Sequence, residues 1–412
     1  MNDNVTTTVD NFTIQNGYDN GDGGGILSHG TLTLTRSTVS YNYTGWTGGG
    51  IAVVNGSSAN IIDTRIFSNT THSKGGGIAV WDGSSVNIHG TKIYANTAKY
   101  GEGGGIYADS GHLNISRSWV VGNAAPDNDA GGIFFGVSAY IENSIIAGNT
   151  SASSAGGLQF GPGGPYHIVN SHIVGNYTPE FGSAIATWKP AQVILTNTLV
   201  ISNTGSTAFY DKYGSGSEFL LNYCDTYGNS PDGTYGLTIT RTNCLGTPPE
   251  DGLDPLMAGG ALPSGVGPDY ADEWLSYDYR LLSGSPAIDA GTLVDAPATD
   301  IEGTPRDATP DMGAYEFYLH YLTVSLAGTG SGSVSSTPTG ISCSPDAGSD
   351  CTENFDYGTL VTLTATADSS STFAGWSGDC SGSSDCAVTM TEAYAVTATF
   401  NLAEVYLPLI SR

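Results

Sequence analysis

The chain has 412 residues, enough for about two or three domains, and 12 Lys and Arg face 39 Asp and Glu, a formal net charge of −27. Nucleic acid and anionic membranes require a basic footprint, so neither is expected as a partner. Charged residues make up only 12% of the chain and Gly contributes 58 residues, which is typical of turn-rich β structure. No apolar run reaches the roughly 18 residues of a membrane span. Residues 1–3 do not open a signal peptide, so an exported protein would already have lost its signal.

One asparagine recurs every 26 or 27 residues through the first part of the chain. Its positions are Asn16, Asn42, Asn69, Asn96, Asn123, Asn149, Asn176, Asn203 and Asn229. A glycine motif that ends in Ile or Leu follows the first seven of these asparagines after a short loop, from Gly23–Ile26 to Gly182–Ile185. Two marks that stay in register over successive repeats indicate a solenoid of stacked coils.

Before each Asn the residues alternate between apolar and polar, which predicts strands. Eight residues before it stand Leu34, Ile61, Ile88, Ile115, Ile141, Ile168 and Leu195. Three residues before it stand Val39, Ile66, Ile93, Val120, Ile146, Ile173 and Val200. Five residues before it a hydroxyl recurs at Ser37, Thr64, Thr91, Ser118, Ser144, Ser171 and Thr198. With the Ile of the glycine motif, these columns predict three short strands per turn, stacked about 4.8 Å apart.

The asparagine column has a physical explanation in such a coil. Asn tolerates the left-handed conformation where one strand bends into the next, and its amide can bond the Asn above and below. The expected ladder comprises Asn42, Asn69, Asn96, Asn123, Asn149, Asn176 and Asn203. A leucine-rich repeat has a shorter period, and strand alternation excludes a helical solenoid. We therefore predict an all-β parallel β-helix of three sheets and about nine coils over residues 1–245.

The glycine motif and the φ-x-x-Asn form, as in Ile66–Asn69 and Val120–Asn123, resemble the repeats of polymorphic outer-membrane proteins. More broadly, they are similar to right-handed β-helix proteins of the pectin-lyase type. The resemblance covers roughly residues 5–245 and implies a right-handed coil.

Residues 246–318 change in character and become rich in Pro and Gly. Residues 279–291 and 311–317 closely resemble the choice-of-anchor Q segment of bacterial surface β-helix proteins, which implies an exported product. The residues themselves suggest a cap over the strand edges that end a solenoid, since bare edges promote aggregation. We expect Arg306 to form a structural ion pair with Asp300, Asp307 or Asp311.

Residues 319–401 alternate as strands between Gly/Ser/Pro turns. Residues 373–380 and 386–390 resemble the divergent InlB-type B-repeat of bacterial surface proteins. Close spacing predicts two disulfides, Cys343 with Cys351 and Cys380 with Cys386, and hence an oxidising compartment and a secreted or surface location. The state of Cys224 and Cys244 stays open. We expect Trp376 in the core, and a tail over 402–412 that is an edge strand or a sorting remnant.

Two sets of residues could support chemistry or metal binding. Arg65 and Lys92 stand four residues before the Asn in adjacent coils, where a polysaccharide lyase could use a cationic base; they fit a solvated face as well. Asp19 and Asp22 lie in an oxygen-rich loop that could hold Ca²⁺ or form a plain turn. No other cofactor is expected, and the histidines lack metal-ligand spacing.

Aromatic residues give the stronger indication of a binding surface. Tyr107 and Phe134 share an outward column, Trp81 lies two positions further along its strand, and Trp46 and Tyr100 lie in loops. Such rings could stack on sugar faces, or pack against a loop or another protein.

Three functions follow as expectations. The first is an extracellular or cell-surface adhesion or scaffold protein without catalysis, whose partner is a polysaccharide or cell-surface glycan. The second is a lyase or hydrolase of acidic polysaccharides that uses the Arg65/Lys92 face. The third is a matrix or fibre subunit, which would reveal itself by ordered self-association.

Overall fold

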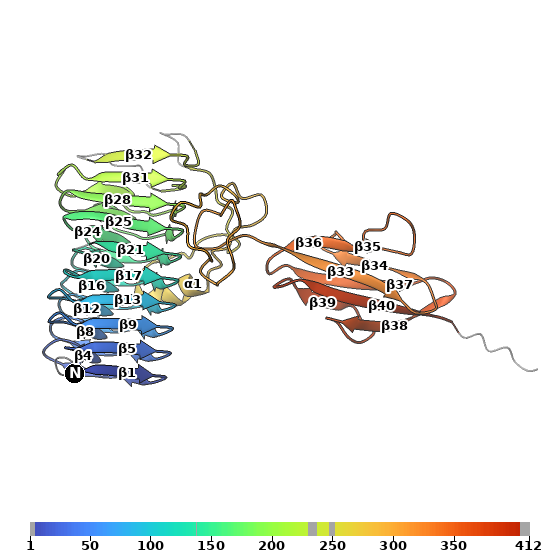
Figure 1. The fold of residues 1–412 in the computed structure, drawn as a ribbon, viewed down its shortest axis with the longest axis horizontal. Coiled ribbons are helices and arrows are strands. Elements are labelled where there is room, and N and C mark those ends of the chain that lie inside the picture. The colour runs from blue at the N-terminus through green and yellow to red at the C-terminus, as the bar shows by residue number, and fades with distance from the viewer. Residues whose placement is uncertain (1–4, 137, 230–236, 247–251, 404–412) are drawn as a thin grey trace, which may run out of the picture. The chain divides into compact units, whose positions relative to one another are not determined.

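The computed structural model describes residues 5–136, 138–229, 237–246 and 252–403 (Figure 1). The chain forms two compact units, residues 1–317 and 318–412, each described by itself. The first unit contains a 3-10 turn η1 (Pro268–Tyr270) and a short helix α1 (Ala271–Ser276). In the described ranges, no helix has the length and apolar character to cross a membrane.

The first unit is a right-handed parallel β-helix, as predicted. Its described residues form four parallel sheets, because a sheet of two-residue strands joins the three expected ones. Sheet A contains β1 (Thr6–Asp10), β5 (Thr31–Thr35), β9 (Ser58–Ile62), β13 (Ser85–His89), β17 (His112–Ser116), β21 (Ala139–Glu142), β25 (Gly163–Val169), β28 (Ala191–Thr196), β31 (Glu218–Asn222) and β32 (Thr238–Thr242). Sheet B contains β2 (Thr13–Gln15), β6 (Thr38–Ser40), β10 (Arg65–Phe67), β14 (Lys92–Tyr94), β18 (Trp119–Val121), β22 (Ile145–Ala147), β26 (His172–Val174) and β29 (Leu199–Ile201).

The chain reaches sheets C and D after each ladder Asn. Sheet C contains β3 (Tyr18–Asp19), β7 (Tyr43–Thr44), β11 (Thr70–Thr71), β15 (Thr97–Ala98), β19 (Ala124–Ala125) and β23 (Thr150–Ser151). Sheet D contains β4 (Ile26–Ser28), β8 (Ile51–Val53), β12 (Ile78–Val80), β16 (Ile106–Ala108), β20 (Ile133–Phe135), β24 (Leu158–Phe160), β27 (Ile185–Thr187) and β30 (Phe209–Asp211). The strands of each sheet stack in register, so equivalent residues of adjacent coils lie side by side.

The interior is built from the aliphatic columns seen in the sequence. Ile61, Ile88 and Ile115 are stacked in register in sheet A and are fully buried. The Ile of the glycine motif is equally buried, as at Ile78 in sheet D. Each column shields its own copies from water, so the apolar core runs the length of the coil.

A buried amide ladder joins the coils beside sheet B. The Nδ2 of Asn96 donates to Oδ1 of Asn123 at 3.0 Å and to the carbonyl of Ile66 at 2.9 Å, while the Asn96 backbone N–H donates to the same Oδ1 at 3.0 Å. The left-handed bend, expected at the Asn, lies on the residue before it in most coils. These residues are Tyr41, Ser68, Ala95, Gly122, Gly148, Gly175, Ser202 and Gly228. The backbone N–H of each Asn can therefore donate to the Oδ1 of the Asn in the next coil, as Asn96 does to Asn123.

Residues 252–317, here called the side segment, pack mainly along the outer face of sheet B (Figure 1). The expectation of a cap over the terminal strands is therefore wrong for most of this segment. Trp274 of α1 is buried against sheet B, where a Cβ added at Gly175 would lie 2.0 Å from its Cη2. Val174 and Leu199 lie in the same apolar cluster. Small residues at the left-handed bends thus make room for the indole.

Polar contacts attach the side segment to a second asparagine column, at the bend between sheets A and B. Nδ2 of Asn143 donates to the Thr299 carbonyl at 2.6 Å, and Nδ2 of Asn170 donates to that of Asp311 at 3.1 Å. Nδ2 of Asn197 donates in the same way to the side segment, to the Thr292 carbonyl at 2.7 Å. These amides thereby give hydrogen bonds to backbone carbonyls of the side segment that would otherwise lose their partners when the segment packs against the coils.

Arg306 forms a structural ion pair, but its partner differs from the three expected aspartates. Arg306 pairs with Glu316 at 2.7 Å. Asp300 and Asp311 accept backbone N–H groups instead, and Asp307 accepts the N–H of Thr309. These aspartates stabilise turns of the side segment, which leaves Glu316 to neutralise the guanidinium.

The second unit is a small all-β module of two four-stranded sheets. One sheet has the order β36 (Thr352–Asp356), β33 (Leu319–Ala327), β40 (Tyr394–Leu402) and β38 (Ser371–Gly378). The other has the order β35 (Ser342–Cys343), β34 (Gly332–Thr337), β37 (Leu360–Ala367) and β39 (Cys386–Thr389). Residues 404–412, which include most of the expected tail, lie outside the described residues.

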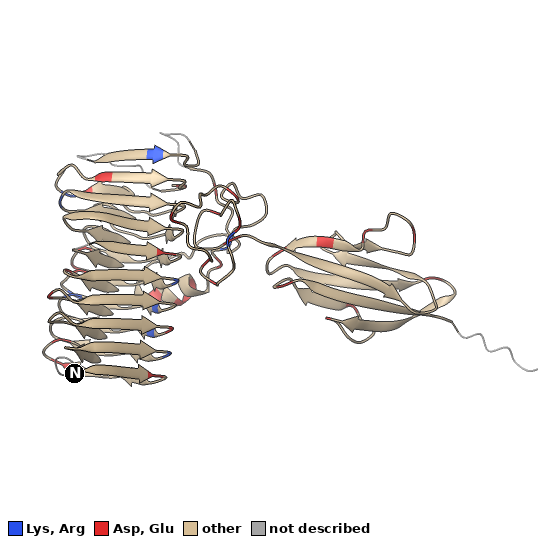
Figure 2. Cartoon of the chain, viewed as in Figure 1, with Lys and Arg blue, Asp and Glu red and all other residues tan. Residues whose placement is uncertain are grey.

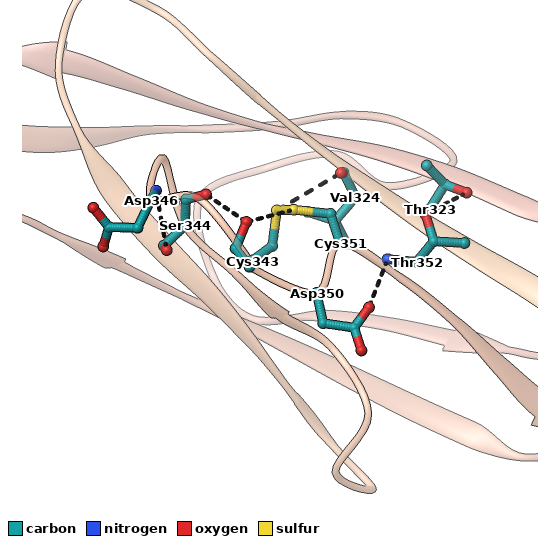
Figure 3. Close-up of a disulfide and its surroundings, with 9 residues drawn as sticks. Thr323, Val324, Cys343, Ser344, Asp346, Asp350, Cys351 and Thr352 are labelled. Atoms are coloured by element: carbon teal, nitrogen blue, oxygen red, sulfur yellow. Dashed lines mark hydrogen bonds between the residues drawn. A yellow bond between two sulfur atoms is a disulfide. The ribbon is translucent and has the colours of Figure 1, made fainter.

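Both expected disulfides are present in this module, Cys343–Cys351 and Cys380–Cys386. Figure 3 shows the first beside Val324 of β33, so it fastens the short strand β35 and the following loop to the other sheet. Trp376 packs in the core, as expected, and its Nε1 donates to the Ser384 carbonyl at 2.7 Å. A module this small has a thin core, and local disulfides contribute much of its stability.

Candidate functional site

The predicted aromatic column of Trp81, Tyr107 and Phe134 forms one cluster on the outer face of sheet D. Tyr107 and Phe134 are paired across β16 and β20, with stacked rings 4.8 Å apart. They are only 2% and 3% exposed, however, so the expectation of open ring faces is wrong for both. The Lys74 side chain covers Tyr107: its Nζ donates to the Tyr107 hydroxyl at 2.7 Å and lies 4.3 Å from that ring centroid. Burial raises the pKa of Tyr107 well above its ordinary value.

Two ion pairs involve residues close to this cluster in the chain, one between two loops that lead into sheet D and one that joins such a loop to the residue after β30. Lys74 pairs with Glu102 at 3.2 Å, and Lys212 pairs with Asp129 at 2.6 Å. The buried Gln159 donates to the same Asp129 carboxylate at 3.3 Å. Glu102, Gln159 and Lys212 were not identified from the sequence, because their partners lie in other coils and no repeated pattern marks these contacts. Because Tyr107 and Phe134 are almost fully buried, this cluster offers neither of these rings to a ligand.

A second group of aromatic residues is open to solvent along sheet C. Tyr18, Tyr43, His72 and Tyr100 contact one another in succession, with ring centroids 5.1, 5.6 and 5.3 Å apart. Trp46 lies in the loop after β7. We call these five residues the aromatic row. Tyr18 is 71% exposed, Trp46 64% and Tyr100 62%. The row therefore includes two of the predicted ligand-binding residues, Trp46 and Tyr100.

The backbone beneath the aromatic row is held by hydrogen bonds between coils. The Trp46 carbonyl accepts from the Ser73 N–H at 3.1 Å and from Oγ1 of Thr71. The Tyr100 N–H donates to the His72 carbonyl at 3.0 Å. Since sheet C repeats at the spacing of the coils, rings at equivalent positions stack along the axis. The row is a set of exposed rings on a rigid support, which suits contact with a flat, extended ligand.

Asp19 and Asp22, the expected Ca²⁺ ligands, lie beside this row. Oδ1 of Asp19 accepts the Gly21 N–H at 2.8 Å, and Oδ1 of Asp22 accepts from the Thr47 hydroxyl at 2.6 Å. In the described residues, no three His, Cys, Asp or Glu side chains gather as a metal site would require. Both carboxylates act in local turn and cross-coil contacts, and Ca²⁺ binding stays a prediction.

Arg65 and Lys92 occupy equivalent positions on the outer face of sheet B, next to Trp119. The Nζ of Lys92 lies 5.0 Å from the Trp119 ring centroid. Burial, and the nearby charge of Arg65, lower the pKa of Lys92. A groove of about 450 Å³ beside them is lined in part by Asp63, Arg117 and Trp119.

This groove combines charges of both signs. Arg117 is held in place by donating from Nε to the Ile301 carbonyl at 2.9 Å. Lys and Arg occupy only a few short stretches of the ribbon (Figure 2), so a cationic face is uncommon in this acidic chain. An ammonium with a lowered pKa beside an open groove has the chemistry of a weak base or an anion contact.

Comparison with known protein families gives matches in both units. Residues 1–152 match the right-handed β-helix region, and residues 322–404 match the divergent InlB B-repeat domain. No curated protein matches the chain. Neither match concerns polymorphic outer-membrane repeats or the choice-of-anchor Q segment, and these resemblances stay predictions. A β-helix joined to an InlB B-repeat-like module with two disulfides indicates a surface or extracellular repeat protein.

Proposed function

We propose that this protein is a non-catalytic extracellular scaffold that contacts an extended glycan through the aromatic row. The observation that supports this most directly is the row itself, in which four rings contact in succession along the coil axis and Trp46 lies nearby. An extended polysaccharide presents one sugar face after another in the same way. The negative faces of exposed aromatic rings attract the weakly positive C–H groups of sugars.

The surroundings of the row favour a neutral or cationic glycan over a strongly anionic one. The chain has a formal net charge of −27, which repels a polyanion. Lys99 is one cation near the row, with its Nζ 5.9 Å from the Tyr43 ring centroid. Asp19 directly follows Tyr18 of the row, and its carboxylate and that of Asp22 could accept hydrogen bonds from sugar hydroxyls.

Affinity electrophoresis against a panel of neutral and charged soluble polysaccharides tests the proposal. Trp46→Ala and Tyr100→Ala should each weaken binding by about tenfold. Tyr213→Ala is the matched control, because Tyr213 is 63% exposed yet lies outside the row. These side chains are exposed, so the variants should keep the circular dichroism spectrum of the wild type. The proposal would be excluded if no glycan retarded the wild-type protein. It would also be excluded if a variant with both Trp46→Ala and Tyr100→Ala were retarded as strongly as the wild type.

A polysaccharide lyase is the second candidate, and the lowered pKa of Lys92 favours it. Incubation with a panel of uronate polymers would reveal unsaturated products by their absorbance. Lys92→Ala should abolish product formation, while Lys189→Ala should not. Lys189 is the matched control because its Nζ also lies over an indole, 4.9 Å from the Trp188 centroid. Absence of product with the wild-type protein would reject this candidate and leave the scaffold proposal intact.

A further inference from the structure

The hydroxyl column of the β-helix ends in two cysteines. Thr198 occupies this column, and its hydroxyl donates to the carbonyls of Thr196 and Ile168 at 2.9 and 3.2 Å. One coil later Cys224 takes the same position, and its thiol contacts the carbonyls of Asn222 and Leu195 at 3.3 and 3.5 Å. Cys244 follows in the next coil. A thiol is a weaker donor than a hydroxyl, so hydrogen bonding alone does not explain why this column changes its chemistry here.

The two cysteines lie directly opposite each other in adjacent coils. β31 and β32 pair in register up to Asn222 and Thr242, and each strand continues through one left-handed residue into its cysteine. The Leu245 N–H donates to the Cys224 carbonyl at 2.9 Å, which keeps the two backbones side by side beyond the strands. Neighbouring strands lie about 4.8 Å apart, and disulfides join Cα atoms that are about 4.4–6.8 Å apart. The backbone spacing therefore suits a bond between the two sulfurs.

The thiols also differ in a way that suits oxidation. Both are unbonded in the structure, Cys224 buried and Cys244 partly exposed. The hydrogen bond from the Cys224 thiol lowers the pKa of Cys244 to about 7, while burial raises that of Cys224. Cys244 is thus the more exposed of the two thiols and the one whose pKa is lowered, and the thiolate is the form that attacks a disulfide.

We infer that Cys224 and Cys244 are joined in the exported protein by a disulfide that fastens β32 to β31. Cys244 thiolate attacks an external disulfide, such as oxidised glutathione, forming a mixed disulfide and releasing one thiol. The Cys224 sulfur, on losing its proton, then attacks the Cys244 sulfur and releases the second thiol. Two protein thiols are oxidised and one external disulfide is reduced. The bond would hold β32, the last described strand of sheet A, to β31. In the described residues β32 has a neighbouring strand on one side only.

Thiol counting tests this inference with an internal control. The protein is refolded in a glutathione redox buffer, unfolded in the presence of iodoacetamide without reductant, and analysed by mass spectrometry. We expect no alkylated cysteine, and a non-reduced digest that contains the peptides of Cys224 and Cys244 joined together. The disulfides Cys343–Cys351 and Cys380–Cys386 report whether oxidation was complete. Two alkylated cysteines at positions 224 and 244 in a protein with both of those bonds would overturn the inference.

Matched variants separate this pairing from others. Cys224→Ser restores the hydroxyl that the column carries in earlier coils, so the fold should be kept. In this variant Cys244 should be the one alkylated cysteine. In Cys244→Ser, Cys224 should be the one alkylated cysteine. A wild-type digest in which either cysteine is joined to the second unit would contradict the pairing. The test does not depend on the glycan proposal, since it measures a bond and no ligand.

Discussion

Arg306 donates to Glu316 across 2.7 Å, and the two side chains are 1% and 2% exposed. The same guanidinium reaches the β-helix through Oδ1 of Asn143 at 2.9 Å. Glu316 also accepts the backbone N–H groups of Asp307 and Asp311 at 3.1 and 3.0 Å. One buried ion pair therefore organises the loop that connects the end of the side segment to the coils.

Replacing Arg306 by Met should destabilise the first unit by about 3–5 kcal/mol, because Glu316 would stay buried without its counter-charge. Urea unfolding followed by tryptophan fluorescence measures the change. Arg36→Met is the control, since the Arg36–Asp10 pair is largely exposed and should leave the midpoint unchanged. Equal midpoints for Arg306→Met and wild type would show that the ion pair does not hold the segment.

Gly175→Ala should release α1 from sheet B. The added Cβ would lie 2.0 Å from the Trp274 ring, and residue 175 has a left-handed φ of +60°. Overpacking and backbone strain should together lower the free energy of unfolding by about 1–3 kcal/mol. Limited proteolysis should then cleave the side segment faster than in wild type. Gly216→Ala has the same kind of backbone strain at φ +87° but no atom within 4 Å, and it should leave proteolysis of the segment unchanged. Similar cleavage of both variants would contradict the role of the indole contact.

A separate, exposed row of amide bonds runs from Asn114 through Asn87 to Asn60 on sheet A, and it should contribute far less to stability than the buried asparagine ladder. Asn123→Ala removes amide bonds of 3.0 Å to Asn149 and the Ile93 carbonyl inside the coil, and should cost roughly 3 kcal/mol because buried partners lose their bonds. Asn114→Ala removes a bond of equal length to Asn87 on the outer face of sheet A. Water replaces that bond, so the midpoint of urea unfolding should barely move. Comparable losses would show that burial is not what gives the inner ladder its strength.

His172 should make the first unit sensitive to acid. Burial, with the nearby charge of Arg306, lowers its pKa to about 3, and its Nδ1 accepts the Ala314 N–H at 3.0 Å. Between pH 6.5 and 3 the unfolded chain binds a proton that the folded chain does not, so the free energy of unfolding falls as the pH falls. The slope contributed by this group approaches about 1.4 kcal/mol per pH unit.

His172→Asn keeps an acceptor for the Ala314 N–H and should remove this slope. Urea unfolding at several pH values between 3 and 7 measures it for both proteins. Burial raises the pKa of Asp311 to about 7, and that of Asp225 likewise, which gives a contribution of opposite sign over much of the same range. The informative quantity is therefore the difference between variant and wild type. A difference that stays constant with pH would contradict the assignment to His172.

The regular interior could be predicted from the sequence because each residue there interacts mainly with its own copy. Ile61, Ile88 and Ile115 recur at one spacing, and the structure stacks and buries them as expected. The disulfides of the second unit were predictable for a similar reason: their cysteines are close in the chain, and few other pairings are available.

Contacts between irregular segments could not be predicted in this way. Tyr107 faces outward, as its strand position requires, but Lys74 covers it from 33 residues earlier in the chain. Asn170 bonds Asp311 across 141 residues, and no repeat relates the two. The aromatic row was found only in part: Trp46 and Tyr100 were identified from the sequence, whereas Tyr18 and His72 were not, because their contacts depend on how neighbouring coils stack.

The register of the inner ladder makes the β-helix adjustable in length. Asn69 and Asn96 are 27 residues apart and make the same bonds to their neighbours. Deleting residues 70–96 would join Asn69 directly to Thr97, which pairs with Thr70 in sheet C and would take its place. The shortened protein should keep every column in phase and lose one rise of about 4.8 Å. The length of the β-helix can thus be changed in steps of one coil without disturbing the packing of the others.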